Sequence, residues 1–276
     1  MAIDLVCVDY KTPGDLQNFY NSLMSYPPVR GGGHPTLTVV ETDETLPSRE
    51  VRQVGWNGSN SGVWMRPGEN LGYAKACNLA AIAGSNEVLA FFNADVMVTP
   101  DAIDVCIEVL LSDPSVAVVG PRQVDTQNRL THAGIVNPGV DRFDQSLMYP
   151  RNWQEPDRGQ MSHIEEVLSV AGSAYFVRRS VWDELNECHL YQHACFEIYG
   201  DFALGAFLPT QHYYEESYLS LHARAHGYRV MYVGETTIVH KWHQASPVGG
   251  VAELVYQPQA RAEFRRACDI HGIIHD

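Results

Sequence analysis

Basic residues are scarce in this sequence. Lysine and arginine total 19 against 33 aspartates and glutamates, which gives a formal net charge of -14. Because nucleic-acid-binding proteins usually carry a basic surface field, we expect no extended DNA- or RNA-binding surface. The acidity still allows a single nucleotide to bind, because a metal ion can bridge carboxylates and phosphates.

Long apolar runs and paired cysteine motifs are also missing. No apolar stretch reaches the roughly 20 residues of a membrane-spanning helix, and the start of the sequence lacks the basic region of a signal peptide. The six cysteines form no CxxC pair, which argues against a zinc ribbon or a thioredoxin-like site. Cys188 and Cys195 are expected to be free thiols, with a disulfide as the alternative in an oxidising compartment. We therefore predict a cytoplasmic protein without a transmembrane segment.

Several familiar catalytic motifs are absent as well. The sequence has no GxGxxG after a strand, no GxxxxGK[ST], no HExxH and no GxSxG. These absences argue against hydride transfer on a dinucleotide-binding site, against P-loop phosphoryl transfer and against a serine-hydrolase elbow.

Short apolar runs alternate with amphipathic segments in the first part of the chain. Strands are expected at residues 3–9, 36–40, 62–65, 88–92 and 116–119, and helices at 14–25, 73–84 and 100–111. Thr99 is the expected N-cap of the last of these helices, with Pro100 at its first position. This alternation predicts an α/β fold with a mainly parallel central sheet and helices on both faces. In such sheets ligands bind at the carboxyl ends of the strands.

The second half of the sequence is less regular. A loop or lid is expected at 137–162, a strand at 167–177, a helix at 215–226 that ends at Gly227, strands at 229–233 and 237–239, and a helical tail at 253–268. The aromatic and histidine-rich segment 186–212 shows no clear periodicity.

Two segments carry candidate metal ligands. Asn93 and Asp95 follow a buried strand, and an extended backbone would point both side chains to the same side. A carboxylate here could hold Mg²⁺ or Mn²⁺ against a diphosphate, whereas the plain alternative is a strand-end turn near a helix cap. His240 follows another strand and could be a second ligand, although a lone histidine is more often structural.

Two helix starts carry further candidates. At the first, Asn70 could bond a ligand or cap the helix, Gly72 permits close approach of the backbone, and Lys75 could neutralise a phosphate. Taken alone, this segment is better explained as a helix N-cap followed by a surface lysine. At the second, Glu215 and Glu216 could supply a general base. Acidic residues also favour helix N-termini through the helix dipole, which is the structural alternative.

Taken in order along the chain, these segments resemble the family-two glycosyltransferases of GT-A fold, especially the rhamnosyltransferase-like bacterial branch. The resemblance extends from about residue 3 to about residue 246. The similar segments are 6–12, 39–42, 70–78, 93–95, 130–134, 171–179, 215–229 and 238–240. Each motif is weak by itself, whereas their shared order and spacing are specific.

The resemblance implies a single GT-A domain over residues 1–276. It divides the chain into a nucleotide-sugar-binding half (1–120), an acceptor-binding and catalytic half (121–246) and a C-terminal helical tail (247–276). The implied reaction is inverting transfer of a hexose-type sugar from a UDP-, dTDP- or GDP-sugar to an acceptor hydroxyl, with Mn²⁺ or Mg²⁺ as cofactor. The acceptor could be a glycan, a lipid-linked glycan, a protein or a small molecule.

The resemblance also assigns roles to residues. Glu216 is the implied general base, with Glu215 in reserve, and Asp95 with His240 is the implied metal site. The implied donor-binding residues are Asp9, Tyr10, Thr12, Glu41, Asn70, Gly72, Lys75, Asn78, Asn93 and Asp95, and the implied acceptor-side residues are Gly172 and Ser173.

The chain departs from the family pattern at a few positions. Glu216 stands where an Asp is usual, and Tyr218 and His222 replace a usual Asp and Arg. Segment 186–212 is also longer than its counterpart. Two alternative functions therefore remain: a non-catalytic nucleotide-sugar- or carbohydrate-binding protein with the same fold, and a sugar-1-phosphate nucleotidyltransferase. The second should have a glycine-rich loop after the first strand, and Lys11-Thr12-Pro13-Gly14 is not such a loop.

Overall fold

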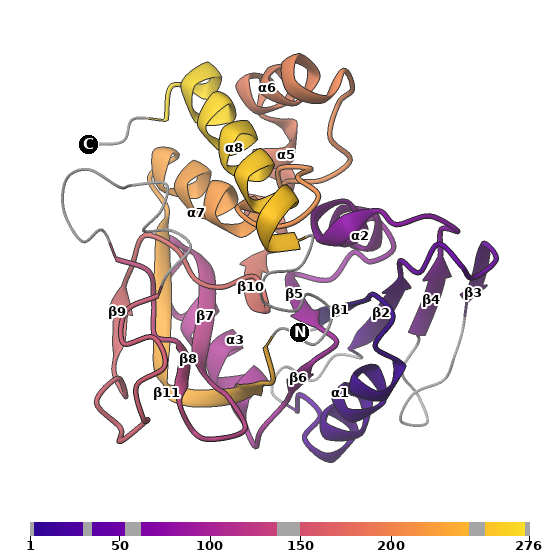
Figure 1. The fold of residues 1–276 in the computed structure, drawn as a ribbon. Coiled ribbons are helices and arrows are strands. Elements are labelled where there is room, and N and C mark those ends of the chain that lie inside the picture. The colour runs from indigo at the N-terminus through magenta and orange to yellow at the C-terminus, as the bar shows by residue number, and fades with distance from the viewer. Residues whose placement is uncertain (1–2, 30–34, 53–61, 137–149, 243–251, 274–276) are drawn as a thin grey trace.

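The computed structural model describes residues 3–29, 35–52, 62–136, 150–242 and 252–273. Its strands form one sheet in the order β3-β4-β2-β1-β5-β10-β7-β11-β6, with β8 paired to β7 and β9 paired to β11 (Figure 1). The strands are β1 (Ile3–Asp9), β2 (Thr36–Glu41), β3 (Arg49–Arg52), β4 (Gly62–Arg66), β5 (Val88–Asn93), β6 (Val96–Met97), β7 (Val116–Val124), β8 (Leu130–His132), β9 (Ile164–Glu166), β10 (Ala174–Arg178) and β11 (Arg229–His240). The helices are α1 (Pro13–Ser25), α2 (Gly72–Ala81), α3 (Ala102–Ser112), α5 (Arg179–Glu187), α6 (His189–Tyr199), α7 (Glu215–Ala225) and α8 (Gln257–His271), the last preceded by a π-helical turn at Ala252–Tyr256.

The expected α/β fold with a central sheet between helices is confirmed. Parallel pairing joins β4, β2, β1 and β5, and also joins β7 to β11. Strand β10 is antiparallel to both of its neighbours, β5 and β7, so the parallel arrangement is confined to those two groups. The expected boundary between the two halves, at residue 120, falls inside β7.

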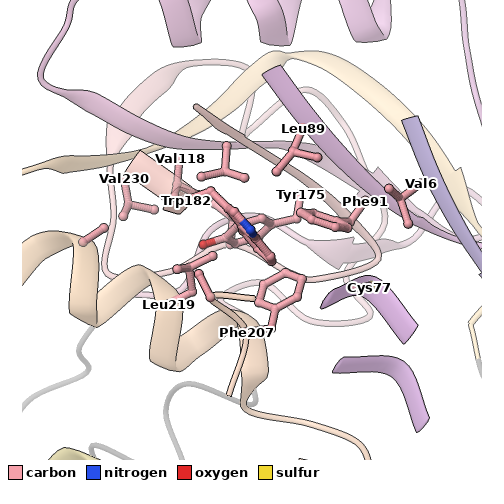
Figure 2. Close-up of a cluster of buried hydrophobic side chains, with 14 of the residues drawn as sticks. Val6, Cys77, Leu89, Phe91, Val118, Tyr175, Trp182, Phe207, Leu219 and Val230 are labelled. Carbon is pink, nitrogen blue, oxygen red and sulfur yellow. The ribbon is translucent and has the colours of Figure 1, made fainter. Parts of the chain in front are cut away.

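Buried side chains alternate between the two faces of the sheet. In β1 every residue is buried, as expected for a parallel strand covered on both sides. Val6 packs in the cluster under α2, α5 and α7, whereas Leu5 packs in the cluster under α1 and α3. Figure 2 shows the centre of the first cluster, where Phe91, Trp182 and Phe207 meet.

A third cluster lies outside the sheet. It joins α6, α7 and α8 through side chains that include Tyr191, Tyr218 and Phe264. In Figure 1, α8 lies across α7 and beside α6. The C-terminal helix, expected at 253–268, therefore covers the outer side of α7 and belongs to the packed body of the protein.

Three sequence expectations need correction. Helix α3 begins at Ala102 rather than at Pro100, because Asp101 adopts a left-handed backbone with φ 60°. The strand expected at 167–177 is confined to β10, because residues 171–173 form a turn before it. Segment 186–212 contains the end of α5 and all of α6, whose aromatic side chains obscured the helical period.

Strand β11 is one long strand where two short ones were expected. Its pairing with β7 shifts between Val233 and Thr237, at an irregularity that contains Gly234. A Cβ atom at Gly234 would lie 1.9 Å from the carbonyl oxygen of Met161, so only glycine fits there. The loop or lid expected at 137–162 lies outside the described residues up to position 149. Residues 150–162 form short turns and an isolated antiparallel bridge between Pro156 and Arg129.

Candidate active site

The polar residues predicted from the sequence gather at one edge of the sheet. This edge contains the carboxyl ends of β1, β2, β5 and β11, the start of the antiparallel β10, and the N-termini of α2 and α7. Asp9 and Glu41, the last residues of β1 and β2, are register partners and are both buried. The chain thus brings acidic groups from separate segments to the place where α/β sheets bind ligands.

The turn after β1 is fixed by its own side chains. The Thr12 hydroxyl donates to Oδ1 of Asp9 at 2.5 Å, and the backbone N–H of Thr42 donates to the Asp9 carbonyl at 2.9 Å. Burial raises the pKa of Asp9, while the bonds from Thr12 act in the opposite direction. Tyr10 is half-buried, and its hydroxyl donates to Glu44 at 3.5 Å. This turn is therefore a preformed polar loop beside Glu41.

Glu41 is held by two donors that the sequence reading did not include. The indole N–H of Trp64 and the guanidinium of Arg66, both on β4, bond to its Oε2 atom. The strand predicted at 62–65 contains Trp64, so a contact between its alternate side chains and β2 could have been predicted. These two donors fix the orientation of the carboxylate, which suits a group that binds a ribose or base.

The start of α2 is built by a close backbone approach. Gly72 has φ 71°, and a Cβ there would lie 2.2 Å from the carbonyl oxygen of Gln211. The Asn70 side chain accepts from the Gly72 N–H at 2.9 Å, and Tyr73 donates its hydroxyl to the carbonyl of Gly172 at 2.5 Å. Glycine is therefore required at position 72 because the backbone of Gln211 lies against it, whereas the sequence suggested close approach to a ligand.

Asp95 and His240 come together across the pairing of β6 with β11. Nε2 of His240 lies 3.3 Å from Oδ1 of Asp95, and both residues are about nine-tenths buried. A carboxylate beside an imidazole is a donor set that fits Mn²⁺. One detail of the sequence argument was wrong: β5 ends at Asn93, and Ala94 and Asp95 form a turn, so the two polar side chains do not share an extended backbone.

The turn before β10 connects the metal-ligand candidates to α7. The N–H of Asn93 donates to the carbonyl of Ser173 at 3.1 Å, and the Ser173 hydroxyl donates to Gln123 at 2.7 Å. On the other side, a Cβ at Gly172 would lie 3.5 Å from Cβ and Cγ of Glu216. Gly172 and Ser173 therefore form a continuous wall between Asn93 and Glu216.

The two glutamates at the start of α7 have different surroundings. Glu215 is 4% exposed, and its Oε2 atom accepts from the Thr210 hydroxyl at 3.2 Å. Burial and the neighbouring charge of Glu216 raise its pKa well above the usual value. Glu216 is half-buried, and burial raises its pKa to about 7, against opposing hydrogen bonds from the backbone and Ser217. A pKa near neutrality and a place beside Gly172 suit Glu216 for proton transfer.

Two expected donor contacts, Asn78 and Lys75, lie in different surroundings. Asn78 is 2% exposed, and its amide brackets the backbone of Phe207: Nδ2 donates to the carbonyl at 2.8 Å and Oδ1 accepts from the N–H at 3.1 Å. Its side chain has a structural role, because both polar atoms are already used. Lys75 is exposed on α2, so its ammonium group could reach a bound donor only from the solvent-exposed side of the site.

Two polar residues near this edge were missed. Gln123 is fully buried at the end of β7, and its Nε2 atom lacks a hydrogen-bond partner among the described residues. The strand was expected to end at residue 119, so Gln123 was not predicted to lie near a strand end. His132, whose segment was noted without a role, accepts the N–H of Ala171 at 3.3 Å, and burial lowers its pKa to about 3. A neutral His132 thus helps to fix the turn that leads to Gly172.

Solved structures with this fold include several glycosyltransferases. GalNAc-T7, crystallised with UDP, GalNAc and Mn²⁺, aligns with a TM-score of 0.64 and 12% identity over 97% of this chain and 48% of its own. The mannosyltransferase PcManGT from Pyrobaculum calidifontis, in complex with GDP-Man and Mn²⁺, has a TM-score of 0.51 and 14% identity over 98% of this chain and 69% of its own. S. aureus TarS 1-349 has a TM-score of 0.51 and 11% identity over 98% and 72%. The chain therefore has the GT-A fold and spans about half the length of GalNAc-T7.

Sequence comparison gives the family. No curated protein matched the chain. The sequence model described as "Glycosyltransferase like family 2" matches residues 35–257, which is well over half of the chain and includes every element from β2 to β11. In the described part of the chain, no helix has the length and apolar character needed to cross a membrane. The chain belongs to glycosyltransferase-like family 2.

Proposed function

We propose that the chain is an inverting, metal-dependent glycosyltransferase that moves a sugar from a nucleoside-diphosphate sugar to an acceptor hydroxyl. The observation that carries the proposal is the wall from Asn93 through Ser173 and Gly172 to Glu216. Asp95, two residues after Asn93, pairs with His240 at one end of this wall. A candidate cation site and a carboxylate of raised pKa thus lie on the same edge of the sheet. Inverting transfer needs these two functions on opposite sides of the anomeric carbon.

The donor would lie across the ends of β1, β2 and β5. The turn formed by Asp9, Tyr10 and Thr12, together with Glu41, would hold the nucleoside. The start of α2 at Asn70 and Gly72, with Asn93, would face the diphosphate and sugar, and Lys75 would approach from the rim. UDP and GDP-Man in the related structures support a nucleotide-sugar donor, and a dTDP-sugar is equally compatible with these residues.

The chemistry assigned to this chain is proton removal and positioning. Glu216 would accept the proton of the acceptor hydroxyl while that oxygen attacks the anomeric carbon from the face opposite the leaving group. Glu215, more buried and bonded to Thr210, would remain the reserve base. A divalent cation held by Asp95 and His240 would supply Lewis-acid neutralisation of the departing diphosphate. Gly172 and Ser173 would form the acceptor-side wall.

The finer assignments also belong to this proposal. They are hexosyl transfer, membership of the rhamnosyltransferase-like branch, the division into a donor half and an acceptor half, and action in the cytoplasm. The acceptor class stays open among glycans, lipid-linked glycans, proteins and small molecules.

A hydrolysis assay without acceptor tests the proposal. Purified protein is incubated with UDP-, dTDP- and GDP-sugars and Mn²⁺, after a thermal-shift screen has selected the donor. A ligand that binds only the folded state stabilises it by about 2.7 kcal/mol at a hundredfold excess over Kd. We expect slow release of the nucleoside diphosphate with Mn²⁺ and none with EDTA. Tight binding without release would make the chain a binding protein, and a product of retained anomeric configuration would exclude inversion.

A further inference from the structure

Four potential metal ligands meet at the far end of α7 from Glu216. They are Cys188, between α5 and α6, His222 on α7, His226 at the C-cap of α7, and His271 at the end of α8. One ligand atom from each lies within 4.8 Å of all the others. His222 and His226 are four residues apart, a spacing that places both on one face of a helix.

His222 has unused hydrogen-bonding capacity in a buried place. The side chain is fully buried, and neither Nδ1 nor Nε2 has a hydrogen-bond partner among the described residues. Orphaned polar atoms in a protein interior are rare and costly, so such a group calls for an explanation. The neighbouring rings of His226 and His271, with centroids at 4.9 and 4.2 Å, supply no bond to it.

The other two histidines already have their outer ring nitrogens occupied. Nδ1 of His271 lies 2.8 Å from the Tyr218 hydroxyl, and Nδ1 of His226 lies 2.9 Å from Oε1 of Glu184. In both rings Nε2 is left for the centre of the cluster. Metal-bound histidines are typically oriented in this way, by a hydroxyl or carboxylate on the nitrogen that does not bind the metal.

The distance between Cys188 and His271 suits a small tetrahedral ion. Zinc bonds of about 2.3 Å to sulfur and about 2.0–2.1 Å to nitrogen place neighbouring ligand atoms roughly 3.3–3.6 Å apart. Sγ of Cys188 lies 3.6 Å from Nε2 of His271. One thiolate with three imidazoles is a soft donor set that favours Zn²⁺ over Mg²⁺ or Mn²⁺.

We propose that Cys188, His222, His226 and His271 form a structural Zn²⁺ site. With four protein ligands the coordination is complete, and no open position is left for catalysis. The site joins the junction of α5 and α6, the end of α7 and the end of α8. It also gives a role to Tyr218 and His222, two positions at which α7 departs from the expected family pattern. The site is separate from the candidate cation site of Asp95 and His240, which lies at the ends of β5 and β11.

Metal analysis of the purified protein tests this site directly. We expect about one equivalent of zinc per chain, retained through gel filtration. Removing it with a strong chelator should lower Tm, and adding Zn²⁺ should restore Tm, because metal binding is coupled to the folded state. Co²⁺ added to the zinc-free protein should produce the intense visible bands of a tetrahedral site and a thiolate-to-cobalt charge-transfer band.

Matched variants locate the ligands. Cys188→Ser should abolish the charge-transfer band and lower zinc content several-fold, and His222→Ala should also lower zinc content. His193→Ala, an exposed histidine on α6, should change neither. If the ligand variants fail to fold, the zinc content and cobalt spectrum of the wild-type chain decide the question. Wild-type protein without zinc that gives no thiolate band with Co²⁺ overturns the proposal, as does full zinc content in Cys188→Ser.

The result is independent of transferase activity. Asp95→Ala should keep its zinc, because that residue lies at the other metal site. Loss of zinc in Asp95→Ala, with retention in Cys188→Ser, would place the zinc at the sheet edge and contradict the site proposed here.

Discussion

Nε2 of His240 lies 3.3 Å from Oδ1 of Asp95 because the end of β11 pairs with β6. The two residues are far apart in the sequence, and only the return of β11 to this edge joins them. Lys241 strengthens the junction by donating its N–H to the Asp95 carbonyl at 3.0 Å. This pair supports a prediction about metal-dependent nucleotide binding.

Asp95→Ala should remove the metal dependence of nucleotide binding. Calorimetry on the wild type should show weak binding of a nucleoside diphosphate in EDTA and tight binding with Mn²⁺ or Mg²⁺. In Asp95→Ala both affinities should equal the weak value, because the carboxylate that would hold the cation is gone. Glu197→Ala, an exposed acid on α6, is the control. Equal wild-type affinity with and without metal would refute the metal role.

Glu41→Ala should raise the donor KM by about tenfold to a hundredfold. The estimate corresponds to one lost hydrogen bond to a charged group, about 1.5–3 kcal/mol. Some stability should also be lost, because Trp64 and Arg66 lose their shared acceptor. Glu44→Ala, at a more exposed acid nearby, should have a smaller effect. A donor KM that stays at the wild-type value in Glu41→Ala would leave Glu41 with a structural role only.

Glu216→Gln should lower kcat by about 10² to 10⁴ while donor affinity stays near the wild-type value. The amide keeps the size and polarity of the side chain and removes its basicity. Glu215→Gln is the matched comparison, and its effect should be smaller because Glu215 faces Thr210. The reverse order of effects would make Glu215 the base. If both variants turn over normally, neither glutamate is the base.

The pH dependence of turnover should follow the ionisation of Glu216. Because the base must be deprotonated, kcat should rise with pH and level off above the Glu216 pKa of about 7. Stability should change in the opposite direction. Between the usual glutamate value of 4.5 and about 7, the folded state holds more protons than the unfolded state, so stability falls as pH rises.

Stopped assays for kcat and urea unfolding at about pH 5 and pH 8 would measure both trends. The double variant Glu215→Gln, Glu216→Gln should show a flatter stability profile than the wild type. A wild-type kcat that is constant from about pH 5 to pH 8 would separate Glu216 from the proton transfer.

Asn78→Ala should destabilise the fold without weakening donor binding. The substitution strands the N–H and carbonyl of Phe207, at a cost of about 1–3 kcal/mol for each buried group left unpaired. Urea unfolding measures the loss, with Asn21→Ala on the exposed side of α1 as control. A large loss of donor affinity with unchanged stability would restore the donor contact that the sequence suggested.

The fold could largely be predicted because its strands are short apolar runs with helices between them. β1 is buried along its whole length, and α1 places Leu16, Phe19 and Leu23 on one face. Both patterns are local, and the rule that ligands bind at strand ends then indicated Asp9, Glu41 and Asp95.

Other features depend on contacts that no local pattern records. Asn78 could be read as a ligand contact because nothing near it in sequence reveals Phe207 as its partner. The cluster of Cys188, His222, His226 and His271 was likewise hidden, although the spacing of His222 and His226 was visible. Cys188 and His271 come from other helices, so the lack of a CxxC motif excluded a zinc ribbon but gave no information about this arrangement.

The irregularity in β11 sets which side of the strand faces the candidate active site. Between Val233 and Thr237 this strand advances four positions while β7 advances one, from Pro121 to Arg122. The inward and outward alternation of Ile238–His240 is therefore out of phase with that of Val230–Val233. Because side chains alternate with a period of two, removing one residue here would turn His240 away from Asp95. The number of residues in this segment therefore decides which face of the sheet the His240 side chain points to. A single-residue deletion at the irregularity should damage the site far more than a substitution at an exposed position such as Glu235.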